Sequence, residues 1–230
     1  RQRQMCIRDS LSLRASFDYR LHEKHRLKFG GDYLFHNFRP EQNTMKSWYK
    51  DSVKSQETNT VYANSLIHGH EVSFFAEEEM HVIERLTANV GLRATVFHVQ
   101  GETYFSMQPR LSVRYLLARR LSAKLSNSKM NQYIHLLSNS YISQPTDIWV
   151  PVTRNINPMN AHQYTAGLYY TLHRQYNFSV EGYYKRMNNL IDYKDRIQVG
   201  TDYSNWEERV GVGYGRAYGC LLYTSPSPRD

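Results

Sequence analysis

The sequence predicts an all-β protein: an antiparallel, up-and-down transmembrane β-barrel fragment of about nine strands, which is an incomplete barrel. Two observations predict this fold class. Apolar and polar residues alternate with a period of two along much of the 230-residue chain, so that each strand has one apolar and one polar face. Tight turns also alternate with long loops, which is typical of a barrel with short turns at one end and long loops at the other.

The first predicted strand, residues 11–21, shows the alternation most clearly. Its apolar face carries Leu11, Leu13, Ala15, Phe17, Tyr19 and Leu21. Its other face carries Ser12, Arg14, Ser16, Asp18 and Arg20. A helix, with 3.6 residues per turn, cannot place these two sets on opposite faces. A turn at residues 22–25 leads into a second strand at 27–35, so the pattern predicts a hairpin.

Further strands follow with the same alternation. They are predicted at residues 72–76, 86–96, 111–117, 121–128, 163–172, 177–184 and about 207–219. The tight connections are 22–25, 83–85, 118–120 and 173–176, and the long ones are 39–69, 130–160 and 191–205, with 100–103 a short exception. A β-sandwich would scatter its loop lengths. A sheet in lipid must close on itself, because lipid offers the backbone no hydrogen-bond partner.

Charge and hydropathy narrow the function classes. The net charge is +8, but Lys and Arg are spread one or two per strand without a dense patch, which argues against a nucleic-acid partner. The mean hydropathy is −0.66 and no apolar run is long enough for a membrane-spanning helix. A barrel is compatible with the low mean hydropathy and with the absence of a long apolar run, because half of the residues of each strand face water.

Both ends of the chain lie outside the strand pattern. Residues 1–10 and 220–230 resemble translated sequencing-adapter sequence and are predicted to be non-native. Residues 11–219 are then the natural barrel part. Cys6 and Cys220 both fall in the excluded ends, so the natural part has no disulfide, zinc or thiol chemistry.

Tyrosines on the apolar face are predicted to form a girdle at the membrane surface. They are Tyr19, Tyr33, Tyr115, Tyr170 and Tyr184, all near strand ends or turns. Tyrosine is favoured at headgroup depth, where one end of the ring is apolar and the other is wet. In the alternative, a soluble core, these hydroxyls would simply reach the protein surface. The excess of 19 Tyr over 9 Phe favours the girdle.

The long loop at 130–160 is the candidate ligand site. Its side chains able to stack on or hydrogen-bond a ligand are Tyr133, His135, Trp149 and Arg154. Two prolines, Pro145 and Pro151, stiffen the loop and lower the entropy cost of binding. Trp48 and Tyr49, in the loop at 39–69, are further candidates. The alternative is that Trp149 and Ile148 only pack this loop against the barrel rim.

Other chemistry has weaker support. His68 and His70 are two imidazoles with no carboxylate or Cys nearby, so a solvated pair is favoured over a metal site. Glu77 and Glu79 are expected on the lumen face and Glu78 on the opposite face. No phosphate-binding loop and no recognisable Ser/His/Asp set occurs, so we expect no catalytic site, no metal and no cofactor.

Six motifs, in order, resemble the barrel of TonB-dependent outer-membrane receptors. They are residues 73–79, 86–93, 108–115, 128–140, 145–153 and 178–191. The resemblance covers most of 11–219 and implies energy-coupled uptake of a scarce ligand through a plugged barrel in the outer membrane of a Gram-negative bacterium. The ligand would be a siderophore, cobalamin, a glycan or a peptide. The partners would be outer-membrane lipid and an energy-coupling inner-membrane complex, reached through a missing N-terminal part.

The sequence contains no coupling motif, no plug and no closing C-terminal strand of the kind the family has, so we expect it to be a middle-to-late section of the barrel. Two other function classes stay open. The strands alone would equally allow a passive or structural outer-membrane barrel. A soluble β-protein, including an enzyme, is disfavoured by the asymmetry of the connections. An upstream plug would separate the first two classes, and detergent dependence of folding would remove the third.

Overall fold

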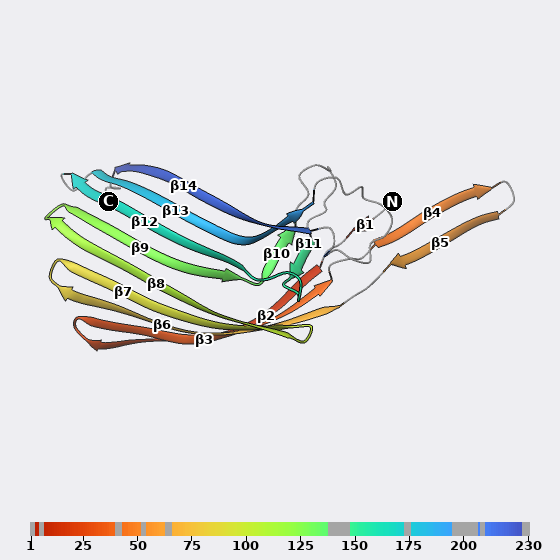
Figure 1. Ribbon diagram of the computed structural model, residues 1–230, viewed down its shortest axis with the longest axis horizontal. Helices are drawn as coiled ribbons and strands as arrows, with labels where there is room; N and C mark the ends of the chain where they lie inside the picture. Colours follow the sequence, from red (N-terminus) through yellow and green to blue (C-terminus); the bar gives the residue numbers. More distant parts are fainter. Residues whose placement is uncertain are drawn as a thin grey trace.

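The computed structural model of the chain consists almost entirely of antiparallel β-strands (Figure 1). It describes residues 3–4, 7–39, 43–51, 54–62, 66–137, 148–172, 176–194, 207 and 210–226. Nine strands form one sheet in the order β14-β13-β12-β9-β8-β7-β6-β3-β2. They are β2 (Ile7–His22), β3 (His25–Arg39), β6 (Ile67–Ile83), β7 (Leu86–Val99), β8 (Glu102–Ala118), β9 (Leu121–Gln132), β12 (Met159–Leu172), β13 (Tyr176–Tyr193) and β14 (Val210–Pro226). The sheet is open, with β2 and β14 at its two edges, and the predicted fold class of an incomplete antiparallel barrel is confirmed.

Two smaller sheets account for the remaining strands. One contains β1 (Arg3–Gln4), β4 (Asn43–Asp51) and β5 (Lys54–Tyr62), and the other pairs β10 (Ile134–Leu137) with β11 (Ile148–Pro151). Both regions were predicted to be loops, and this prediction is wrong. Short hairpins inside long connections lack the run of alternating residues that reveals the barrel strands.

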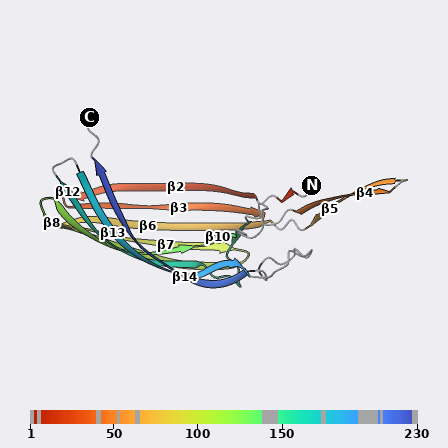
Figure 2. The same ribbon diagram turned by 90° about the horizontal axis from the view of Figure 1, so that it is seen from above.

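The main sheet is strongly curled. Seen from above, β14 runs steeply across the direction of β2 and β3 (Figure 2). Such coiling is the expected result of the right-handed twist that each strand adds to the next. The inner surface of this curl is the surface on which β10 and β11 lie.

The barrel strands are longer than the alternation predicted. The third predicted strand, residues 72–76, extends over Ile67–Ile83, because pairing with β3 continues through Gly69 at one end and the three glutamates at the other. The loop expected from residue 130 begins at Tyr133, since Met130 still pairs with Ala161. Pairing also covers Ile7–Ser10 and Cys220–Pro226, and the adapter origin of residues 1–10 and 220–230 stays a prediction.

The short connection between β7 and β8 is a two-residue turn at Gln100 and Gly101. Both residues have positive φ, 49° and 85°. This is the geometry of a type I′ hairpin turn, which fits the twist of the two strands and strongly favours glycine. At the loop end of the sheet, the connection between β7 and β8 therefore extends only a short way beyond the strands.

The two faces of the sheet differ as predicted. On the outer face, Leu11 and Leu13 are 70% and 72% exposed. On the inner face, Ser73 and Thr95 are 0% and 1% exposed, and their hydroxyls are 2.9 Å apart. An apolar outer face and a polar inner face are the arrangement that a barrel in lipid requires.

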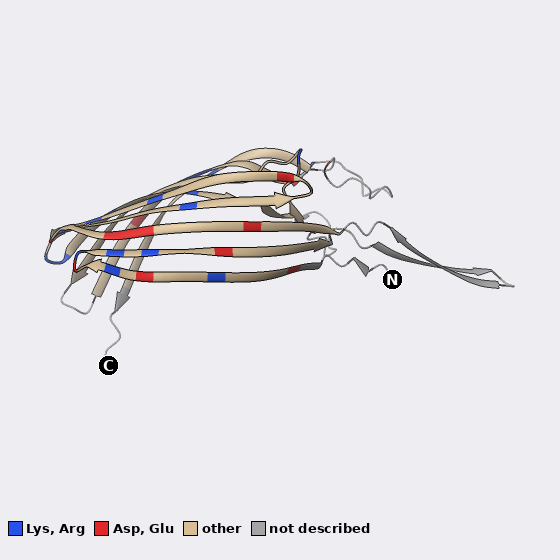
Figure 3. Cartoon of the chain, turned by 90° about the horizontal axis from the view of Figure 1, so that it is seen from below, with Lys and Arg blue, Asp and Glu red and all other residues tan. Residues whose placement is uncertain are grey.

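Charged side chains of the inner face pair across the strands. Arg26 Nε donates to Asp18 Oδ1 at 3.0 Å, and Asn89 Nδ2 donates to Glu77 Oε1 at 2.6 Å. Figure 3 shows both acidic and basic positions on β2 and β3, and acidic positions alone on the neighbouring β6. Glu78 is on the outer face, where its Oε1 lies 2.8 Å from His25 Nδ1, so the predicted facing of the three glutamates is confirmed.

Aromatic and imidazole rings group on the outer face near the loop end. The hydroxyl of Tyr33 hydrogen-bonds His70 Nδ1 at 2.9 Å, and Phe35 stacks on His68 with ring centroids 5.6 Å apart. His68 and His70 are thus held by ring contacts. In the part of the chain that the structure describes, no group of three or more His, Cys, Asp or Glu is placed to hold a metal ion.

Among the described residues, no helix has the length and apolar character needed to cross a membrane.

The two faces should respond differently to an added charge. Leu92 is an exposed outer-face residue of β7, whereas Thr87 of the same strand faces inward opposite Arg114. In the full-length receptor, we expect Leu92→Arg to prevent insertion into lipid vesicles, because Arg at the bilayer midplane costs about 2–4 kcal/mol. Thr87→Arg should insert normally. The measurement is the heat-modifiable gel shift of each variant after folding into vesicles; equal insertion of both would contradict the assignment of faces.

Candidate functional site

The described parts of the connection between β9 and β12, residues 133–137 and 148–158, fold onto the inner face of the sheet at its loop end (Figure 1). Within it, β10 and β11 form an antiparallel pair in which Ile134 pairs with Pro151 and Leu137 with Ile148. The pair continues beyond β10, because the backbone N–H of Val152 donates to the carbonyl of Tyr133 at 2.9 Å. This β10–β11 hairpin is the candidate site.

Tyr133 is the anchor of the hairpin. Its side chain is buried, and its ring stacks on Phe97 of β7 with centroids 5.0 Å apart and planes 11° apart. Its hydroxyl donates to Ser106 Oγ of β8 at 2.5 Å. Burial raises the pKa of this hydroxyl, which keeps it protonated as a donor. Tyr133 therefore fixes the hairpin to two neighbouring barrel strands.

Apolar residues of the inner wall surround Tyr133. The buried members of this mouth cluster are Phe38, Ile67, Phe97, Val99, Tyr133, Ile134 and Val152, with Tyr104 and Trp149 partly buried against them. Phe38, Phe97 and Val99 occupy inward positions, which are polar closer to the turn end. This reversal of the alternation is the sequence signal that could have revealed the docking surface, although the prediction from sequence did not include it.

A second cluster holds the other side of the hairpin. Leu137, Val150 and Ile156 pack with Val210 of β14, and Ile191 of β13 lies partly buried against them. The hairpin thus contacts strands near both edges of the curled sheet, β3 on one side and β14 on the other. Its position is fixed by packing rather than by its own short strand pairing.

His135 is buried within the hairpin. It is 4% exposed, and burial lowers the pKa of its imidazole to about 4. Its Nε2 has no hydrogen-bond partner among the described residues. His135 is therefore neutral at physiological pH and turned away from solvent.

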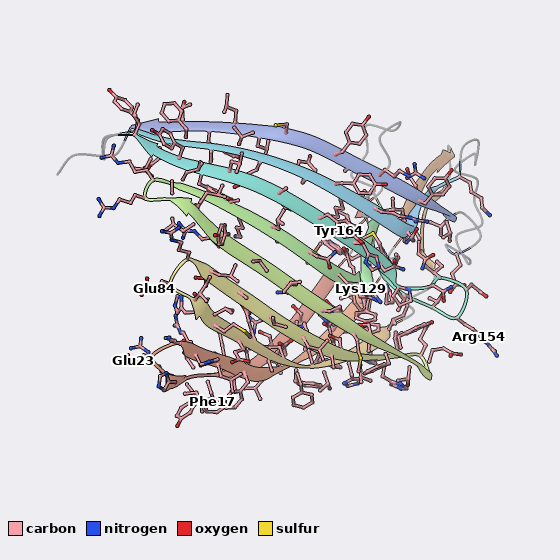
Figure 4. The ribbon with its side chains drawn as sticks, turned by 60° about the vertical axis from the view of Figure 1, so that its left-hand side comes forward. Phe17, Glu23, Glu84, Lys129, Arg154 and Tyr164 are labelled. Carbon is pink, nitrogen blue, oxygen red and sulfur yellow. The ribbon has the colours of Figure 1, made fainter. Side chains whose placement is uncertain are left out.

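Arg154, in contrast to the buried His135, is exposed to solvent. It lies in the tight turn between the bridged residues Thr153 and Ile156, and its side chain is 86% exposed. Its Nε is 3.7 Å from Glu102 Oε1, at the start of β8. Figure 4 shows Arg154 projecting from the loop end of the molecule. The turn is held in place by Tyr104, whose hydroxyl donates to the Thr153 carbonyl at 2.6 Å.

The structure therefore separates the candidate residues. It brings Tyr133 and Trp149 into one cluster, buries His135, and leaves Arg154 exposed in the turn that follows β11. Trp48 and Tyr49 lie in β4, but their side chains are outside the described residues, as is Pro145. A ligand-binding role for the six candidates stays a prediction.

A cluster of largely buried polar side chains, which we call the polar wall, lies on the inner face next to the mouth cluster; it contains Asp32, His36, Glu71 and Arg93. Arg93 Nη2 donates to Asp32 Oδ2 at 2.6 Å, and His36 Nε2 lies 3.8 Å from Glu71 Oε2. Asp32 Oδ1 and both ring nitrogens of His36 lack hydrogen-bond partners among the described residues. Buried polar atoms are normally satisfied. This polar wall was not found from the sequence, because its members are spread over three strands.

The fold and this site define an outer-membrane-type β-barrel whose loop end carries a hairpin docked against its inner wall. The family described as TonB dependent receptor-like, beta-barrel matches residues 2–219. The chain belongs to this family, whose members are receptors and transporters of the Gram-negative outer membrane. No curated protein sequence matches the chain.

Solved structures of similar fold agree with this assignment. The FrpB iron transporter from Neisseria meningitidis (F5-1 variant) has a TM-score of 0.68 at 14% identity, covering 98% of this chain and 35% of that one. The copper transporter OprC has a TM-score of 0.63 at 16% sequence identity, with 99% of this chain and 37% of that chain covered. The ferripyoverdine receptor of the outer membrane of Pseudomonas aeruginosa has a TM-score of 0.60 at 13% identity, with 100% of this chain and 31% of that chain covered. At these identities the similarity shows the fold, and this chain spans about a third of each structure's length.

Acid should release the hairpin. Because the folded pKa of His135 is about 4 and the ordinary value is 6.5, docking is at full strength above pH 6.5 and weakens as pH falls from there toward 4. The shift corresponds to about 3 kcal/mol. Fluorescence of Trp149, measured in a Trp48→Phe/Trp206→Phe background, should report release in this window. His135→Leu should remove the transition, and an unchanged transition in that variant would assign it to another group.

Proposed function

We propose that the chain is a section of the barrel of an importer that takes up a scarce ligand through the outer membrane by energy coupling. The observation that carries this proposal is the β10–β11 hairpin fixed to the inner wall at the loop end. A hairpin placed there narrows the entrance and presents side chains to anything that enters. The family membership and the iron and copper transporters of similar fold support the same class of function.

The side chains of the hairpin and of the turn after it suit several classes of ligand. Arg154 offers a guanidinium, which can bind carboxylate or phosphate groups through paired hydrogen bonds. Trp149 offers a large amphipathic ring beside the mouth cluster. A metal-carrying siderophore, cobalamin, a glycan or a peptide would each find complementary groups, and we propose a ligand of this kind without choosing among them.

The proposed partners follow from the same function. The outer face would contact outer-membrane lipid, and the energy would come from an inner-membrane complex that acts through an N-terminal part of the receptor. We place the protein in the outer membrane of a Gram-negative bacterium. We further propose that residues 11–219 are its natural barrel part and that residues 1–10 and 220–230 are adapter-derived.

A passive or structural barrel is the alternative. The observation that favours it is the polar inner wall, where Asp32, Arg93, Ser73 and Gln108 would equally line a water-filled channel. The two functions predict different binding and transport of the ligand by a receptor whose plug is intact. A passive barrel would equilibrate its solute, whereas the importer would bind it tightly and require energy for uptake.

The ligand role of the hairpin is testable in the full-length receptor. Arg154→Ala and Trp149→Ala should each raise the dissociation constant of the ligand about tenfold, equivalent to about 1.4 kcal/mol, with no change in barrel stability. The measurements are ligand affinity in detergent and uptake in cells. Arg119→Ala, at the turn end, is the matched control for an exposed arginine. If affinity and uptake are unchanged in Arg154→Ala, Trp149→Ala and His135→Ala receptors that still fold, the hairpin is a structural cover.

A further inference from the structure

The outer face of the sheet carries a row of basic side chains at one height on four neighbouring strands. In β9, β12, β13 and β14, Lys129 pairs with His162, His162 with Arg186 and Arg186 with Arg216. These residues share the face of the apolar outer side chains, because each lies an even number of residues from an outward tyrosine or leucine on its own strand. Together they form what we call the basic row.

The basic row lacks acidic partners. Within the described part of the chain, no ion pair or side-chain hydrogen bond involves any of its four members. Arg186 and Arg216 are directly opposite each other, and like charges in that position destabilise a sheet. Elsewhere on the sheet arginines meet carboxylates, as Arg93 meets Asp32. The uncompensated repulsion in the basic row would be relieved by an external anion.

Tyrosines lie directly beside the basic row, one step closer to the turn end. Asn127 pairs with Tyr164, Tyr164 with Tyr184 and Tyr184 with Tyr218. All three tyrosines are exposed on the outer face, and Tyr164 lies close to Lys129 in Figure 4. Tyrosine rings in such a row mark the depth at which acyl chains meet headgroups.

An apolar groove of about 920 Å³ opens beneath these tyrosines. Its lining includes Leu111, Leu125, Tyr164, Ala166, Gly182 and Tyr184. The groove exists because the next row across the strands contains small residues: Ala166 pairs with Gly182, and a Cβ added to Gly182 would meet nothing within 4 Å. A groove bounded by leucine and tyrosine on a membrane-facing surface fits an acyl chain.

The height of the basic row agrees with a headgroup. His162 precedes the turn end of β12, Leu172, by ten residues. Ten strand residues span about 33 Å, which at a tilt of about 40° gives roughly 25 Å along the membrane normal, the height of the apolar band of outer-membrane barrels. The basic row therefore lies at the loop-side edge of the membrane.

We propose that this surface binds one anionic membrane lipid, with its phosphate headgroup on the basic row and an acyl chain in the groove beneath the tyrosines. Lys129, Arg186 and Arg216 supply the charge, and His162 can donate an additional hydrogen bond. The site rests on the membrane location of the family and is independent of which ligand the receptor imports.

Lipid selectivity of the unaltered chain provides the first test. The full chain is folded in a nonionic maltoside detergent and titrated with phosphatidylglycerol or with phosphatidylcholine of identical acyl chains, and native mass spectrometry counts bound lipid. We expect phosphatidylglycerol to bind at least tenfold more tightly and to weaken as salt rises from 50 to 500 mM. Equal affinity for the two lipids overturns the proposal, as does displacement of phosphatidylglycerol by an equal concentration of inorganic phosphate.

Variants provide the second test. Lys129→Gln/Arg186→Gln/Arg216→Gln should weaken phosphatidylglycerol binding about 100-fold, since each of the three basic residues near a lipid surface contributes about a factor of five. The matched control, Arg110→Gln/Lys124→Gln/Lys185→Gln, removes the same charge from the inner face and should bind normally. Ala166→Trp, which fills the groove, should weaken binding about tenfold. Equal loss in both triple variants, or no loss in the outer one, overturns the proposal.

Discussion

The structure depends on one constraint: lipid cannot hydrogen-bond to a peptide group, so every backbone donor and acceptor of a membrane-spanning strand must find its partner in a neighbouring strand. The nine-stranded antiparallel sheet meets this requirement for its seven inner strands, each of which has a neighbour on both sides, and the alternation of side chains follows from the same constraint. Because the period of a strand is exactly two, a shift of one residue would place Arg93 in lipid and Leu92 in the lumen. The register is therefore fixed by solvation on the two faces, with turns such as Gln100–Gly101 in agreement with it.

The inner face is divided along the strand direction. Toward the turns it carries charged pairs such as Arg26 with Asp18, and toward the loops it carries Phe38, Phe97 and Val99. The apolar end is the reason that the β10–β11 hairpin docks at all, since a short two-stranded pair is marginally stable alone and needs a surface to pack on. The same side chains that would be misplaced in a water-filled lumen are satisfied by Tyr133, Ile134 and Val152.

The barrel strands could be predicted from sequence because a strong, local signal specifies them. Alternation over 11–21 or 86–96 needs no knowledge of the rest of the chain. The hairpin could not be predicted in the same way, because Tyr133 is recognisable as an anchor only once Ser106 and Phe97 are known to face it from strands more than twenty-five residues away. The same limit applies to His135 and Arg154, which look alike in sequence as polar loop residues. Their opposite burial is decided by packing against Val150 and by the turn at Thr153.

The two-residue turn between β7 and β8 has a mechanical consequence for the site. Glu102 and Tyr104, which hold the turn at residues 153–156 after β11, directly follow the β7–β8 turn, and a turn with two residues at positive φ has little conformational freedom. The support beneath residues 153–156 is accordingly as stiff as the sheet itself. Displacement of these residues cannot be absorbed by gradual bending of that support, and must break the Tyr104 and Tyr133 hydrogen bonds together. The hairpin should consequently behave as a latch with two positions rather than as a graded spring.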